Sequence, residues 1–337
     1  MKRYSSTPRV VRGGSVAALA VTLLLAAGCG SDGSDGGGSS DGTLKVSSLG
    51  YCSEIPLWWA EEKGLFDDRG LDVELVEAGG GGSTTIAAAV GGSVDVAFTA
   101  PGEVIQAIQG GTPLTWIATA YGFPTDEEAA TSGAMVKDGS SIERFSDLEG
   151  RTVALTAVGG VSEATVAGAI RADGGDPSSV KWVALPGGQL LQAVLSGKVD
   201  VAQTPLPVAS MEGLRNIGSP HTLVTGGVSM PFAGYAQTTD FYTSHEKQAE
   251  DFYDALTQAG EELNDPANAD EMYRIMAERC GQTVEALKQT PMNPIMADVN
   301  MPGLEKYVDI LVQGKVVRED SLPDLEELVA PFAQSGS

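Results

Sequence analysis

The sequence predicts an α/β fold in two lobes, each with a parallel-rich sheet flanked by helices and joined by a hinge of two chain crossings. Three observations predict it. Short strand-like segments alternate with helix-like segments from residue 44 onward, one strand motif occurs twice, and a helical region follows the second copy. Such alternation is typical of sheets whose strands run mainly parallel.

Residues 1–28 have the order of a secretion signal, in which basic residues precede an apolar stretch too short to span a bilayer comfortably. The sequence "LLAAGC" resembles a bacterial lipobox and predicts that Cys29 becomes the lipid-modified first residue. An ordinary secretion signal before an unmodified cysteine is the alternative. Residues 29–42 are then expected to comprise the lipidated cysteine and a Gly/Ser/Asp-rich flexible linker. The body is expected outside the cell, anchored to the outer face of the membrane.

The first predicted lobe begins with a strand at 44–50, a short helix at 56–63 and a strand at 71–76. Further segments follow in the same rhythm. They are a glycine loop opening a helix in "GGGGSTTIAAAVGG", a strand in "VDVAFT", a helix in "PGEVIQAIQGG" and a strand in "LTWIATA".

The second predicted lobe repeats part of the first. "GGSVDVAFTAP" (91–101) and "SGKVDVAQTPL" (196–206) align without gaps, so that Asp95 matches Asp200 and Thr99 matches Thr204. This repeat indicates two similar α/β units. Strands and helices in "RTVALTAVGGVSEATVAGAIRADGG" and "VKWVALPGGQLLQAVLSGKVDVAQTPLP" complete the second unit.

The sequence after the second unit predicts helices. We expect these helices to pack back on the first unit, because they are too apolar to remain exposed to solvent. The helices are expected at 246–264, 270–280, 284–288, 303–313 and 324–333. Lobe 1 would then comprise 43–133 and 232–337, and lobe 2 would comprise 134–231. The two strand-like crossings are expected near 133–137 and 222–235.

Net charge limits the partners. Of 21 lysines and arginines, four lie in the signal, so the rest of the chain carries 17 against 45 acidic residues, a formal charge of −28. Nucleic acid is a poor partner for such a chain, because phosphate binding requires clustered basic residues.

Cysteines and histidines are few. Besides Cys29 the chain has only Cys52 and Cys280, which either form a disulfide or remain as two free buried thiols. Two histidines support neither a metal site nor a His-based triad.

Candidate binding residues lie in loops after predicted strands, where the crevice of an open parallel sheet forms and free N–H groups can hold a ligand. Helix capping is the alternative for each glycine loop. The carboxylates of Glu54, Glu103 and Glu163 would either pair with a ligand or cap a helix. Adjacent Trp58 and Trp59 point about 100° apart on a helix, so Trp59 is expected in the core, and Trp58 either in the core or at the crevice wall. Trp116 is expected in the core.

Five segments in one order resemble the extracytoplasmic solute-binding proteins of the taurine, alkanesulfonate and nitrate ABC-transporter group, which are related to thiamine-pyrimidine-precursor binding proteins. They are "SEIPLWWAEEKGLFDDRGLDVELV", "GGGGSTTIAAAVGGSVDVAFT", "GGTPLTWIATA", "FSDLEGRTVALTAVGG" and "LSGKVDVAQTPLP". The resemblance implies a type II periplasmic-binding-protein fold. "GYCSEIPLWW" departs from the family pattern, so no particular ligand is inherited.

The resemblance and the loop positions together predict one set of ligand-binding residues. They are Tyr51, Glu54, Trp58, Gly81, Gly82, Ser83, Thr84, Thr99, Ala100, Pro101, Gly159, Gly160, Ser162, Glu163 and Thr204. No catalytic residue, metal ligand or cofactor is predicted.

The expected function is capture of a small solute, sulfonate-like, nitrate-like or heteroaromatic, by cleft closure, and delivery to an ABC permease by a monomeric lipoprotein. One alternative is a pyrimidine-synthesis-type enzyme on the same fold, although the cysteine-rich segment and active-site histidine of those enzymes are missing here. Another is a lipoprotein that presents solute to a membrane sensor.

Overall fold

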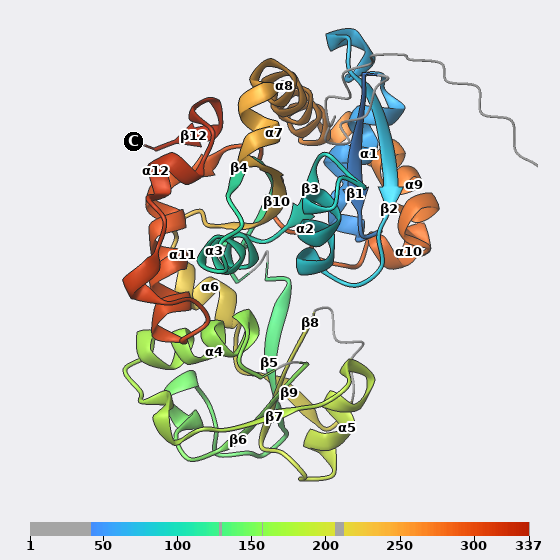
Figure 1. Cartoon of the computed structure of the whole chain (residues 1–337). Coiled ribbons are helices and arrows are strands. Elements are labelled where there is room, and N and C mark those ends of the chain that lie inside the picture. The colour runs from blue at the N-terminus through green and yellow to red at the C-terminus, as the bar shows by residue number, and fades with distance from the viewer. Residues whose placement is uncertain (1–41, 128–129, 157, 206–211, 337) are drawn as a thin grey trace, which may run out of the picture. The chain divides into compact units, whose positions relative to one another are not determined.

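A computed structural model describes residues 42–336 apart from 128–129, 157 and 206–211 (Figure 1). The predicted signal, the predicted lipidation site Cys29 and most of the predicted linker therefore lie outside the described residues. Among the described helices, none is both long and apolar enough to cross a membrane.

The first group of strands comprises β1, β2, β3, β4 and β10, and β3 lies at its centre. β1 (Thr43–Ser48) pairs in parallel with β2 (Asp72–Glu77), and a parallel bridge from Val46 to Val96 joins β1 to the segment entering β3 (Ala97–Thr99). β10 (Pro231–Thr238) lies antiparallel between β3 and β4 (Leu114–Gly122). The first predicted strands are confirmed, and β10 adds an antiparallel member.

The second sheet has five strands in the order β7-β6-β8-β5-β9. β6 (Thr152–Leu155) is parallel to β7 (Lys181–Ala184) and to β8 (Val201–Pro205). β5 (Ser132–Lys137) is antiparallel to β8 and to β9 (Leu214–Asn216). A final short parallel pair joins β11 (Val299–Asn300) and β12 (Gln334–Ser335).

The predicted internal repeat is confirmed by equivalent hydrogen bonds. Asp95 accepts the Lys45 N–H at 2.8 Å before β3, and Asp200 accepts the Thr152 N–H at 2.8 Å before β8. Thr99 is paired with Gly234 of β10, and its repeat partner Thr204 is paired with Gly133 of β5. β3 and β8 therefore hold the same position in their sheets.

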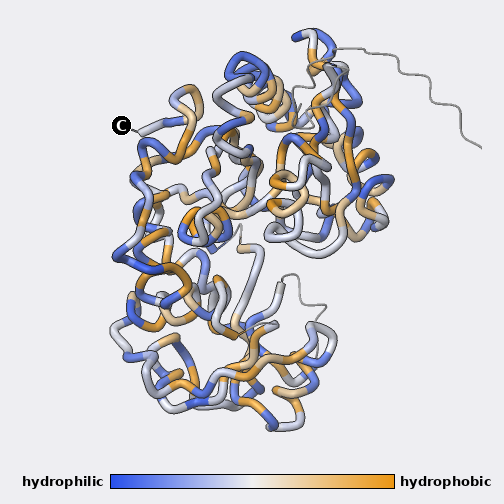
Figure 2. The backbone as a smooth tube through the Cα atoms, viewed as in Figure 1, coloured by the Kyte–Doolittle hydropathy of each residue, from blue (hydrophilic) through white to orange (hydrophobic). Residues whose placement is uncertain are grey.

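Twelve α-helices accompany the described strands. They are α1 (Ile55–Glu62), α2 (Gly82–Val90), α3 (Pro101–Gln109), α4 (Val161–Ala172), α5 (Leu190–Leu195), α6 (Pro220–Thr225), α7 (Thr239–Ser244), α8 (Glu246–Leu263), α9 (Ala269–Cys280), α10 (Val284–Leu287), α11 (Met301–Gln313) and α12 (Leu325–Leu328). Figure 2 shows hydrophobic and hydrophilic residues alternating along them, as amphipathic helices packed on a core require.

Two of the C-terminal helices, α8 and α9, pack back on the first unit, as predicted. α8 and α9 both contact α1. Trp58 and Trp59 are consequently both buried, with exposed fractions of 2% and 1%. The prediction of a core position holds for Trp59 and also for Trp116, and the core alternative holds for Trp58.

Two sequence expectations are wrong. The crossing expected as strand at 222–235 begins inside α6, and β10 starts only at Pro231, because Ser219 caps a helix with Pro220 in its first turn. The helix expected at 324–333 ends at Leu328. Pro331 lacks an N–H and holds the preceding Ala330 extended, so only a short 3-10 turn follows.

α11 contacts helices that lie beside the first strands and helices that lie beside the second sheet. Its Lys306 ammonium donates to the carbonyl oxygen of Thr225 in α6 at 2.7 Å, and α11 also packs against α4. On another side, Leu311 lies against Gly102 of α3. The C-terminal region therefore connects the helices around the first strands with those around the second sheet.

Candidate functional site

Gly82, the first residue of α2, packs against a carboxylate. Glu103 accepts hydrogen bonds from the Thr99 hydroxyl at 2.9 Å and the Ala100 N–H at 3.2 Å. A Cβ on Gly82 would lie 1.8 Å from that carboxylate and 2.5 Å from the Thr99 hydroxyl oxygen. Gly82 is therefore required by close packing against Glu103, while Ser83 and Thr84 stay exposed.

The substitution Gly82→Ala is expected to destabilise the protein by about 1–3 kcal/mol, because Glu103 must move and give up the bonds that hold the start of α3. Gly81→Ala is the matched control, since a Cβ at Gly81 would meet nothing within 4 Å. Urea unfolding of the two variants measures the difference. Equal stability of the two would contradict the close packing.

All three candidate carboxylates hold their own loops. Glu54 accepts the N–H groups of Leu49 and Tyr51 at 3.1 and 2.9 Å. Glu163 accepts the Gly159 N–H at 2.8 Å, and Glu103 holds Ala100 as described above. Between the two possibilities that the sequence left open, these contacts favour loop and helix capping for each of them.

Glu54 is a fully buried carboxylate between β1 and α1. Burial raises its pKa to about 7, although hydrogen bonds from the Tyr51 N–H and the Ser48 side chain work in the opposite direction. Two tyrosines lie near it. Burial raises the pKa of Tyr121 to about 12, and the Tyr235 hydroxyl is buried without a hydrogen-bond partner among the described residues.

The predicted residues of the second unit lie at the ends of β6 and β8. Thr204 and Thr99 are both buried, with exposed fractions of 8% and 2%, so neither threonine offers its side chain openly to solvent. Gly160 caps the start of α4, and Ser162 and Glu163 are in its first turn and half-buried. The neighbouring loops at 157 and 206–211 lie outside the described residues.

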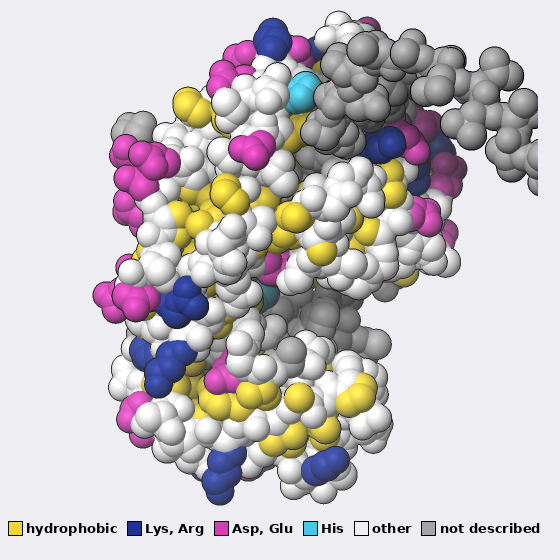
Figure 3. All heavy atoms as spheres, viewed as in Figure 1, with side chains coloured by type: hydrophobic (Ala, Val, Ile, Leu, Met, Phe, Trp, Pro, Cys, Tyr) yellow, Lys and Arg dark blue, Asp and Glu magenta, His cyan; other side chains and the backbone are white. Residues whose placement is uncertain are grey.

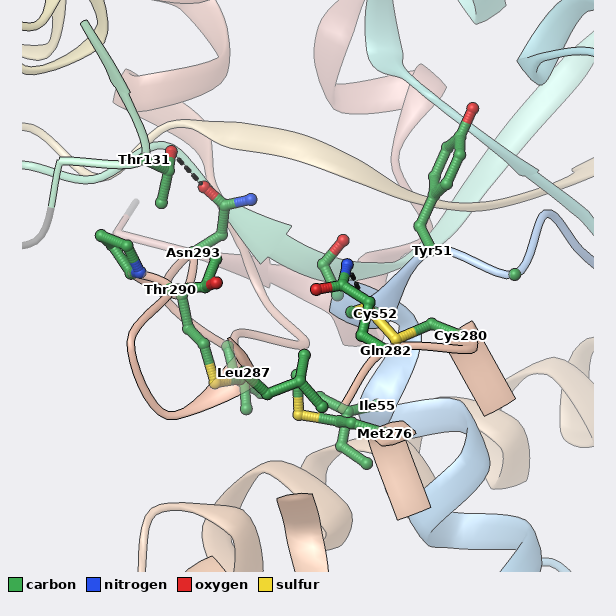
Figure 4. Close-up of a pocket in the computed structure, with 15 residues that line it drawn as sticks. Tyr51, Cys52, Ile55, Thr131, Met276, Cys280, Gln282, Leu287, Thr290 and Asn293 are labelled. Carbon is green, nitrogen blue, oxygen red and sulfur yellow. Dashed lines mark hydrogen bonds between the residues drawn. A yellow bond between two sulfur atoms is a disulfide. The ribbon is translucent and has the colours of Figure 1, made fainter. Parts of the chain in front are cut away.

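A pocket of about 320 Å³ lies beside Tyr51 (Figure 4). Figure 4 shows the side chains of Ile55, Met276 and Leu287 together on one side, and those of Tyr51 and Asn293 on the other. The full lining is Gly50, Tyr51, Cys52, Ser53, Ile55, Thr131, Met276, Cys280, Gln282, Leu287, Thr290, Pro291, Met292, Asn293 and Ile295. Its volume is at the lower end of those that hold small molecules.

Two contacts fix the walls of this pocket. The disulfide Cys52–Cys280, with Cα atoms 5.2 Å apart, joins the loop after β1 to the end of α9 and answers the question that the sequence left open. The Thr131 hydroxyl donates to Oδ1 of Asn293 at 2.9 Å, which joins the start of β5 to the segment before β11. Tyr51 is 46% exposed, and its ring stands edge-on to Phe98 with centroids 6.4 Å apart.

A second pocket of about 270 Å³ lies at the carboxyl ends of β1 and β2, with Trp58, Glu77 and Arg279 in its lining. Trp58 therefore contacts this pocket from within the core. Pro101 lines only a narrow apolar gap against Trp116 and Leu304. From the predicted set, Tyr51 lies in the lining of the first of these pockets and Trp58 in that of the second. A pocket of about 530 Å³ between α11 and α12 is lined by none of the predicted residues.

The pocket beside Tyr51 is built mainly by residues that the sequence did not indicate. α9, α10 and the segment at 290–295 supply most of it, and these segments carry no glycine loop or repeat. The pairing of Cys52 with Cys280 was the one available signal, because a disulfide between them brings the end of α9 to the loop after β1. Among the described residues, no group of three or more His, Cys, Asp or Glu side chains is placed to hold a metal ion.

Comparison with solved structures shows the fold. The periplasmic aliphatic sulphonate binding protein SsuA from Escherichia coli has a TM-score of 0.70 at 17% identity, over 86% of this chain and 98% of that one. The periplasmic nitrate-binding protein NrtA from Synechocystis PCC 6803 has a TM-score of 0.58 at 16% identity, over 84% of each chain. The Candida albicans CA3427 product is described as having the generic periplasmic binding protein fold. It has a TM-score of 0.58 at 16% identity, over 88% of this chain and 96% of that one.

No curated protein matches the chain significantly. A family model does. It is described as NMT1/THI5 like and matches residues 53–269, which include α1, the first glycine loop and the whole second sheet. This match covers well over half of the chain and agrees with the structural neighbours. The chain therefore belongs to the NMT1/THI5-like family and has the periplasmic-binding-protein fold.

Proposed function

We propose that this protein is the solute-binding component of an ABC importer, which captures a small molecule and releases it unchanged. The observation that carries the proposal is the pocket beside Tyr51, which has one apolar side, one polar side and room for a small ligand. Family membership and the likeness to sulfonate- and nitrate-binding proteins support it. Binding energy would shift the equilibrium between an open and a closed form.

The finer parts of the proposal come from the sequence. Lipidation at Cys29 and the linker at 29–42 would hold the protein at the outer face of the membrane, beside its permease. Lobe 1 would comprise 43–133 and 232–337, lobe 2 would comprise 134–231, and the protein would act as a monomer. Acidic side chains gather on and near α12 (Figure 3), which agrees with nucleic acid being a poor partner.

A solute screen by thermal shift tests the function. We expect at least one compound among sulfonates, nitrate, amines, pyrimidines and neutral heteroaromatics to raise the melting temperature and to be recovered unchanged. Conversion of the compound by the purified protein would instead indicate an enzyme. Palmitate labelling of wild type and a Cys29→Ala variant tests the anchor, since only wild type should incorporate label.

The variant Tyr51→Ala is expected to weaken binding of the solute found by about tenfold, because an exposed ring contributes contact to the ligand and little to folding. The backbone N–H of Tyr51, which holds Glu54, is kept in this variant. Titration calorimetry and urea unfolding together measure the result. Unchanged affinity would place the ligand elsewhere.

A further inference from the structure

The pocket beside Tyr51 has an entirely uncharged lining. Its fifteen residues are glycine, proline, aliphatic, aromatic, hydroxyl, amide or sulfur-containing, and neither a cation nor a carboxylate is among them. A charged ligand that enters this pocket gives up part of its hydration and meets no counter-charge in the lining, so the lining favours an uncharged ligand.

The cations next to the lining in sequence are already paired. Arg279 precedes Cys280 and donates to Glu61 of α1. Lys288 follows Leu287, and its ammonium contacts Asp270 at 2.8 Å. Neither side chain lines the pocket, so an anionic ligand there would have no counter-charge.

Helix starts around the pocket are also occupied. The Leu49 and Tyr51 N–H groups donate to Glu54, so a carboxylate of the protein already takes the place that an anion would take at the start of α1. Pro56 in the first turn of α1 has no N–H to offer. At α10, the Thr283 hydroxyl oxygen accepts the Ala286 N–H at 3.2 Å.

Polar atoms suited to a neutral ligand remain. Oδ1 of Asn293 is engaged by Thr131, and its amide nitrogen has no acceptor within hydrogen-bond distance among the described residues. Opposite it, Met276 and Leu287 are each 2% exposed and give the pocket a firm apolar side. Met276 can adapt to ligands of different outline.

We infer that the solute of this protein is uncharged, with an apolar ring or chain that packs on Ile55, Met276 and Leu287 and a hydrogen-bond acceptor that takes the amide of Asn293. This inference rests on the proposed function and narrows its substrate class. It sets the protein apart from the sulfonate- and nitrate-binding proteins whose fold it shares.

Matched ligands of different charge test the inference. With the purified full chain at pH 7, nicotinamide is compared with nicotinate and benzenesulfonamide with benzenesulfonate by titration calorimetry, and ethanesulfonate and nitrate are added as anions. We expect the neutral member of a pair to bind at least tenfold more tightly. Equal or tighter binding of the anions would overturn the inference and leave the solute-binding function standing.

The wider solute screen keeps the two proposals separate. The charge at pH 7 of the tightest compound found there decides the inference, and a cation or zwitterion counts against it as an anion does. Failure of every compound in the screen would contradict the solute-binding function and this inference with it.

The isosteric variant Asn293→Asp tests the location. Its Oδ1 can still accept from Thr131, but the amide donor is lost and a charge is introduced, so affinity for the neutral ligand should fall at least tenfold. Gln289→Ala, at an exposed residue that lies just before the segment at 290–295 and outside the lining, is the control and should bind as wild type does. Equal affinity of the two variants would remove Asn293 from the site.

Discussion

Replacement of both Cys52 and Cys280 by serine is expected to lower the free energy of unfolding by about 2–5 kcal/mol. The disulfide joins residues 228 positions apart, so it restricts the unfolded chain strongly. It also ties the loop that carries Tyr51 to the end of α9. We therefore expect weaker solute binding as well as lower stability, because the two sides of the pocket are no longer linked.

Urea unfolding of the double variant and of wild type with and without dithiothreitol measures the effect. The double variant avoids the single free thiol that either single substitution would leave to form intermolecular disulfides. Reduced wild type and the double variant should agree, since both lack the same link. A double variant with an unchanged unfolding midpoint would show that the disulfide contributes nothing to stability.

The variant Glu54→Gln is expected to be more stable than wild type at pH 8 by up to about 3 kcal/mol, and equally stable at pH 4.5. Burial raises the pKa of Glu54 from its ordinary value of 4.5 to about 7. Between these values the folded protein binds more protons than the unfolded chain. The stability that the protonated Glu54 contributes is therefore complete below pH 4.5 and is lost as the pH rises through 7.

Glutamine reproduces the protonated side chain, because Oε1 of Glu54 accepts from both Leu49 and Tyr51 and an amide oxygen can do the same. Urea unfolding of both proteins from pH 4.5 to 8 gives the difference, in which the other titrating groups cancel. The prediction fails if the variant shows the same pH dependence as wild type between pH 4.5 and 8.

Much of the fold follows from the sequence because its signals are local. Glycines and prolines mark the ends of α1, α2 and α3, and the repeat around Asp95 and Asp200 predicts two equivalent central strands that the structure confirms. The antiparallel strands β5 and β10 were expected only as crossings. Their place in the sheets depends on partners distant in sequence, which periodicity does not reveal.

The site was harder to predict for the same reason. Glycines such as Gly82 and carboxylates such as Glu103 indicate a special backbone, but a residue type does not tell whether that backbone serves a ligand or its own packing. The residues that make the pocket, such as Met276 and Asn293, are ordinary helix and loop residues. Only the fold of the C-terminal region against the loop after β1 brings them together.

The central claim is that an uncharged solute binds beside Tyr51 and leaves unchanged. A crystal structure of the protein with the tightest neutral compound from the screen tests it most directly. The account predicts the intact compound against Met276 and Leu287, with an acceptor atom at the amide nitrogen of Asn293. A compound bound elsewhere, or a converted product in the pocket, would contradict it.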